Sequence, residues 1–82
     1  MRFAASSSEL SEAAMDAAHR MRALMRADIE ELELADRITA MNEELNRDAA
    51  LFDGAWRILA ASERRAWKTF LTLRQEHERE HY

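Results

Sequence analysis

The chain has 82 residues, a net charge of −4, one glycine, and no proline, cysteine or valine. The lack of cysteine excludes a disulfide framework and a thiolate metal site, and the lack of valine leaves a β-sheet poorly supplied. Sixteen of its 39 hydrophobic residues are alanine, so only 23 larger apolar side chains remain for a core. The composition therefore predicts an all-α protein whose small core is completed to a helical bundle by oligomerisation or by a partner.

The N-terminus carries a helix-start signal. Ser6 and Glu9 have the spacing of a capping box, so we expect residues 1–8 to be frayed and residues 9–82 to form a single helical hairpin domain. No apolar segment is long enough for a signal peptide or a membrane span, which indicates a cytoplasmic protein. Arginine outnumbers lysine eleven to one, a ratio that favours a GC-rich bacterial or phage gene.

Two apolar stripes on the first predicted helix point in nearly opposite directions. The first stripe consists of Leu10, Ala14, Ala17, Ala18, Met21, Met25 and Leu32. The second stripe consists of Leu34, Ile38, Met41, Leu45 and Phe52. A supercoil drift of about 20° per heptad is too slow to produce this switch. Because no glycine or proline marks a break between the stripes, we expect one long helix that serves two different partners.

The turn of the hairpin is predicted between Asn46 and Gly54. Asp53-Gly54 is a turn dipeptide, and a glycine just past a helix end supplies a left-handed cap. Alternatively, Gly54 lies inside a helix and the turn is nearer Asn46-Arg47-Asp48.

The second predicted helix runs from Ala55 to Glu80. It would place an aromatic and aliphatic set on one face, which we interpret as core: Phe52, Trp56, Leu59, Trp67, Phe70 and Leu73. Glu63 would then lie in the middle of that face. Ser62 resembles an N-cap, so a break around Ala60–Ser62 is the alternative.

Charge is distributed unevenly along the chain. The segment 28–48 carries a net charge of −6 and the segment 57–74 a net charge of +4. Opposite charges suit antiparallel neighbours, so we expect the two segments to pair. The alternative is that Arg57–Arg74 binds nucleic acid, but no known DNA-binding signature accompanies these bases.

Few residues have a spacing that indicates chemistry. The segment His77-Glu78-Arg79-Glu80-His81 fits the H-E-x-x-H pattern of zinc peptidases, but no third ligand follows it. His77 and His81 are also candidates for a metal site shared by two chains, although a solvated helix end is the preferred interpretation. His19 is interpreted as a surface residue. With no Ser/His/Asp set and no glycine-rich phosphate loop, we expect no enzyme, cofactor or bound metal.

The first stripe would face away from the hairpin core and would therefore need a partner. We expect a protein-binding module, such as an adaptor, an assembly factor, a chaperone or a structural subunit, that acts through residues 10–32. The partner is a second copy of the chain in a homo-oligomer, or a larger protein. An inhibitor or regulator of a larger protein is the alternative within this class.

Overall fold

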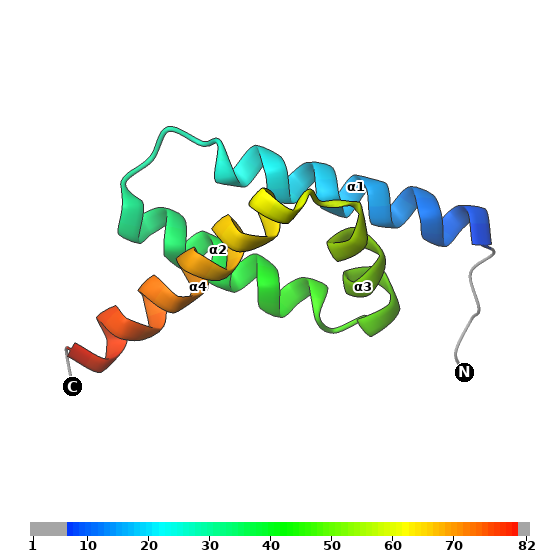
Figure 1. Cartoon of the computed structure of the whole chain (residues 1–82). Helices are drawn as coiled ribbons and strands as arrows, with labels where there is room; N and C mark the ends of the chain where they lie inside the picture. The colour runs from blue at the N-terminus through cyan, green and yellow to red at the C-terminus, as the bar shows by residue number, and fades with distance from the viewer. Residues whose placement is uncertain (1–6, 81–82) are drawn as a thin grey trace.

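A computed structural model describes residues 7–80, and this part of the chain forms four helices and no strand. They are α1 (Ser7–Met25), α2 (Glu31–Leu45), α3 (Ala49–Ile58) and α4 (Ala61–Glu80), arranged as Figure 1 shows. The prediction of an all-α protein is confirmed, whereas the single hairpin is wrong because each of its two long helices is broken. The Ser6 cap and His81 lie outside the described residues.

The predicted long first helix ends at Met25, and α2 starts at Glu31. The last turn of α1 tightens, since Ala27 N–H donates to the Leu24 carbonyl at 3.1 Å. Glu30 then caps α2, and its side chain accepts a hydrogen bond from Glu33 N–H at 3.0 Å. The reversal lets both stripes face one core, and this tertiary gain outweighs the helix propensity of the segment.

The turn between α2 and α3 lies at Asn46–Asp48, so the alternative that kept Gly54 inside a helix is correct. Asp48 is the N-cap of α3, and its Oδ1 accepts from Leu51 N–H at 3.3 Å. Gly54 packs against α1, where a Cβ at position 54 would lie 2.9 Å from the Cβ of Ala14. The glycine therefore serves close helix approach, and its φ is not positive.

The break between α3 and α4 falls at Leu59 and Ala60, at the N-terminal edge of the predicted interval Ala60–Ser62. Leu59 has an extended backbone with φ −64° and ψ 144°. Ser62 is not the cap, because Ala60 precedes the helix and its N–H donates to Glu63 Oε1 at 2.7 Å. Glu63 thus lies in the first turn of α4 and no longer interrupts an apolar face.

The core joins both apolar stripes. α1 packs mainly on α3 and α2 on α4. Ala14, Ala17, Ala18 and Met21 are at most 4% exposed, which overturns the expectation that the first stripe faces away from the chain's own core. The reason is the break after Met25, which folds the chain back and brings α3 onto that stripe.

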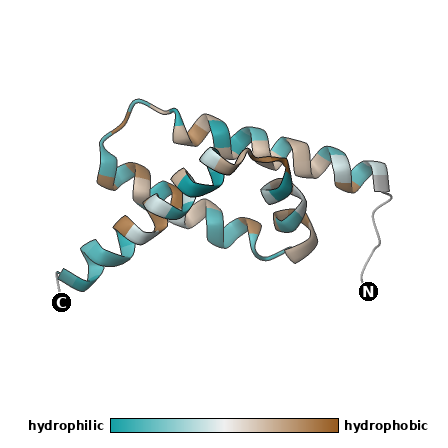
Figure 2. Ribbon diagram, in the orientation of Figure 1, coloured by the Kyte–Doolittle hydropathy of each residue, from teal (hydrophilic) through white to brown (hydrophobic). Residues whose placement is uncertain are grey.

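The acidic and basic segments are neighbours, as predicted. Trp67 Nε1 donates to Asn42 Oδ1 at 3.0 Å, and Arg74 forms an ion pair with Asp36 at 3.0 Å, so α2 and α4 run antiparallel. The hydrogen bond with Asp36 raises the pKa of the Arg74 guanidinium. Figure 2 shows that the C-terminal turns of α4 are hydrophilic where they extend from the rest of the molecule.

Candidate functional site

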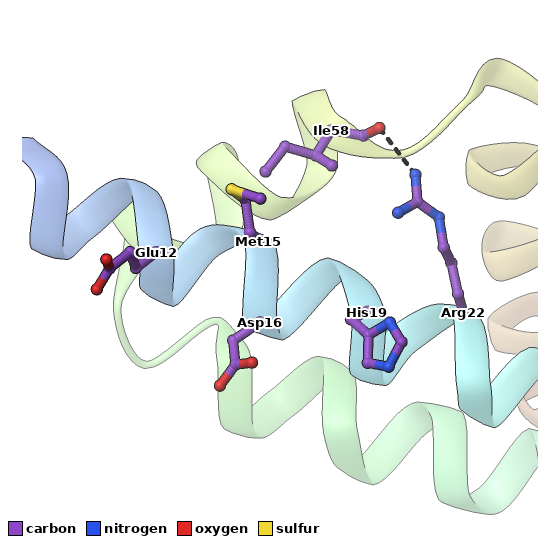
Figure 3. Close-up of a pocket in the computed structure, with 6 residues that line it drawn as sticks. All are labelled: Glu12, Met15, Asp16, His19, Arg22 and Ile58. Carbon is purple, nitrogen blue, oxygen red and sulfur yellow. Dashed lines mark hydrogen bonds between the residues drawn. The ribbon is translucent and has the colours of Figure 1, made fainter.

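An open depression of about 490 Å³ lies where α1 meets the end of α3 (Figure 3). Glu12, Met15, Asp16, His19 and Arg22 of α1 line it together with Ile58 of α3, and we call these six residues the Met15–Ile58 patch. Met15 is 60% exposed and Ile58 37% exposed, and they are the large hydrophobic side chains that the described residues leave in solvent. Exposed apolar groups from two helices thus meet at one surface.

Arg22 fixes one edge of the patch. Its Nη2 donates to the Ile58 carbonyl at 3.1 Å, and its Nε forms an ion pair with Glu63 Oε2 at 2.8 Å. The hydrogen bond from Arg22, together with that from Ala60 N–H, holds the pKa of the Glu63 carboxyl below its usual range. The end of α3, and with it Ile58, is therefore tied to α1 and to α4.

The patch also contains two carboxylates. Glu12 and Asp16 are exposed and form no ion pair within residues 7–80. Figure 3 shows that Asp16 points away from the side of α1 on which Met15 approaches Ile58. Glu12 and Asp16 nevertheless line the same depression as Met15. The patch thus offers an apolar contact with carboxylates nearby, which suits a partner surface that presents an apolar side chain and a positive charge.

The predicted partner-binding stripe does not coincide with this patch. Of its members, Leu10, Met25 and Leu32 are partly exposed, and the other four are buried by their own chain. Met15 was missed because it lies outside the stripe, at a position where a single exposed methionine is unremarkable from sequence alone. The second exposed apolar side chain of the patch is Ile58, which lies 43 residues later in the chain.

A second groove, of about 350 Å³, lies where α2, α3 and α4 meet. Its lining, here called the tryptophan groove, consists of Asn42, Asn46, Phe52, Trp56, Trp67, Lys68 and Leu71. The rings of Phe52 and Trp56 stack with 5.6 Å between their centroids, and Lys68 Nζ lies 5.6 Å from the centroid of the Trp56 ring. The prediction of a core is confirmed for Leu59 and Trp67, which are buried. Phe52 and Trp56 are half-buried and line the groove.

The predicted nucleic-acid segment is partly neutralised by its own chain. Arg57 pairs with Asp53 at 3.1 Å, and Arg74 pairs with Asp36 and with Glu78. Arg64, Arg65 and Lys68 form no ion pair within residues 7–80. The basic segment therefore faces α2 with one end and solvent with the other.

The described residues contain only part of the candidate metal site. His77 is half-buried on α4, His81 lies outside the described residues, and Glu78 of the H-E-x-x-H segment pairs with Arg74 at 2.6 Å. Over residues 7–80, no group of three or more His, Asp or Glu side chains has the arrangement of a metal site. The same stretch contains no helix that is long and apolar enough to cross a membrane.

Comparison with known proteins gives no relative. The chain matches no protein-family model, and neither a curated protein nor a solved structure is similar to it.

Proposed function

We propose that this chain is a small non-catalytic domain that binds another protein through the Met15–Ile58 patch. The observation that carries the proposal is the convergence of Met15 and Ile58, both exposed, on one open depression at the junction of α1 and α3. Apolar groups gathered at one place on the surface of a soluble domain are typical of protein-binding sites. An adaptor, an assembly factor, a structural subunit and an inhibitor all share this mode of action.

The chemistry of the patch suits recognition. Methionine is flexible and polarisable, so Met15 adapts to the shape of an incoming side chain. Arg22 holds the backbone of Ile58 and so presets one wall of the depression, which reduces the entropy lost on binding. Glu12 and Asp16 flank the apolar centre with negative charge that steers a cationic surface towards it.

Site-specific photo-crosslinking in the native host tests the proposal. A photoreactive residue in place of Met15 should give a product of discrete mass, and the same residue in place of Gln75, exposed on α4, should not. The change Ile58→Gln should reduce the Met15 product while the helical circular dichroism stays unchanged. Equal products from positions 15 and 75, or a Met15 product insensitive to Ile58→Gln, would refute the proposal.

A further inference from the structure

The two surface features of this chain carry opposite charge. Glu12 and Asp16 of the Met15–Ile58 patch make no ion pair within the described residues, and neither does Lys68 of the tryptophan groove. The α2 wall of the groove is neutral, since it consists of Asn42 and Asn46. Each surface therefore has a charge outside any ion pair that the other would complement, and the charge of the groove is held beside its ring, since Lys68 Nζ lies 5.6 Å from the centroid of Trp56.

The apolar parts also match. The groove presents the half-buried rings of Phe52 and Trp56, and the patch presents a methionine that is 60% exposed. A thioether makes favourable contacts with aromatic rings, commonly at the ring edge. Met15 is thus the side chain of this molecule best suited to enter the groove.

The patch and the groove have no residue in common. One copy can therefore present its patch to a second copy and accept the patch of a third copy in its groove at the same time. Such a head-to-tail contact generates a ring where the rotation closes and an open chain where it does not.

We propose that the partner of the Met15–Ile58 patch is the tryptophan groove of a second copy of this chain. Met15 contacts the rings of Phe52 and Trp56, and Asp16 approaches Lys68. The assignment rests on the proposed function, because it names the partner of the same patch. A nucleic acid is a poorer occupant of the groove, since Lys68 is the single cation among the residues that line it and phosphate binding draws on several cations.

Sedimentation velocity over a concentration series that reaches the millimolar range measures the association. The mean mass of the wild-type chain should rise with concentration, and added salt should weaken this rise because the charged contacts are exposed. Met15→Gln, which keeps side-chain length and helix propensity, should reduce the association constant by about tenfold. A wild-type chain that stays monomeric throughout would overturn the proposal.

Charge exchange gives the sharper test. Asp16→Lys places a lysine against Lys68 of the next copy, and Lys68→Glu places a glutamate against Asp16, so each variant alone should associate about tenfold more weakly than wild type. A mixture of the two variants, and the double variant, should recover association. No recovery in either sample would overturn the contact. Arg65→Glu, at another exposed position of α4, is the matched control for charge alone and should not be rescued by Asp16→Lys.

The two proposals fail separately. Asp16 and Lys68 are both exposed, so we expect the thermal unfolding of the variants to match that of the wild type. Such a match shows that the fold is intact. If Met15 crosslinks to a different protein while the pure chain stays monomeric, self-association is wrong and the protein-binding function stands. If position 15 gives no specific product and the pure chain stays monomeric, both proposals are wrong.

Discussion

Arg22 and Glu63 form an ion pair, 2.8 Å between Nε and Oε2, that joins the last turn of α1 to the first turn of α4. The same arginine reaches the carbonyl of Ile58 at the end of α3, and the same glutamate accepts the N–H of Ala60. Two side chains thereby satisfy backbone groups at the end of one helix and at the start of the next. They stabilise the connection between α3 and α4 at Leu59 and Ala60, which contains neither glycine nor proline.

The depressed pKa of Glu63 predicts a pH dependence of folding. Because the carboxyl holds its proton less tightly in the folded chain, its stabilising contribution is fully present above the ordinary glutamate pKa of about 4.3 and is lost as pH falls through the lower folded value. Glu63→Gln should be less stable at neutral pH and lose less of its stability on acidification. Urea unfolding over an acidic pH series measures both. Glu44→Gln is the control, since the Arg20–Glu44 pair is more exposed. Parallel pH profiles for wild type and Glu63→Gln would contradict the prediction.

Gly54→Ala should destabilise the chain, although alanine is normally the better helix residue by about 1 kcal/mol. The added Cβ would lie 2.9 Å from the Cβ of Ala14, which is part of a rigid side chain, so α1 and α3 must move apart. Overpacking of this kind typically costs about 1–3 kcal/mol. Urea unfolding of Gly54→Ala, Ala14→Gly and the double variant measures the coupling. The double variant should lose less than the sum of the two single losses, and simple additivity would show that the contact is unimportant.

Substitutions of Met21 and Met15 test whether the first stripe is buried. Met21 is fully buried and Met15 is 60% exposed, although both belong to α1. Met21→Ala should cost about 2–5 kcal/mol of unfolding free energy because it leaves a cavity, whereas Met15→Ala should change it by less than about 0.5 kcal/mol. Similar losses at the two positions, measured by chemical unfolding, would show that the stripe is not buried by α3.

The indole N–H of Trp67, a fully buried residue, donates to one acceptor, Asn42 Oδ1, at 3.0 Å. Asn42→Ala should cost about 1–3 kcal/mol because it leaves this donor unsatisfied. Asn42→Asp keeps an oxygen acceptor and should cost less than Asn42→Ala. Chemical unfolding followed by tryptophan fluorescence measures both variants, and equal losses would mean that the hydrogen bond does not contribute.

The sequence was sufficient for the all-α class and for the pairing of the acidic segment with the basic one, because helix propensity and charge are local properties of the chain. It was insufficient for the break after Met25. Glu30, which caps α2, is not among the preferred N-cap residues, and no glycine or proline lies nearby. The opposite directions of the two stripes did indicate that a straight helix could not bury both of them in one core. A helix that must bury two opposite faces either finds two partners or folds back, and the residues alone do not decide which.

The surface patch was beyond prediction for a different reason. Its apolar part consists of an exposed methionine and an exposed isoleucine that come together only when α3 packs on α1. The apolar pattern predicts a binding stripe that includes Ala14, Ala17, Ala18 and Met21, but these residues are buried in the chain's own core. Which apolar side chains stay exposed depends on how helices that are distant in the chain pack together.

The order of packing has a consequence for how this domain is made. Because α1 rests mainly on α3 and α2 on α4, partners alternate along the chain. A cut in the Asn46–Asp48 turn would separate each helix from its main partner, so neither half would hold a core of its own. During synthesis, α1 meets its main partner only when Ala49–Ile58 has been made, and α2 meets its main partner only when Ala61–Glu80 has been made.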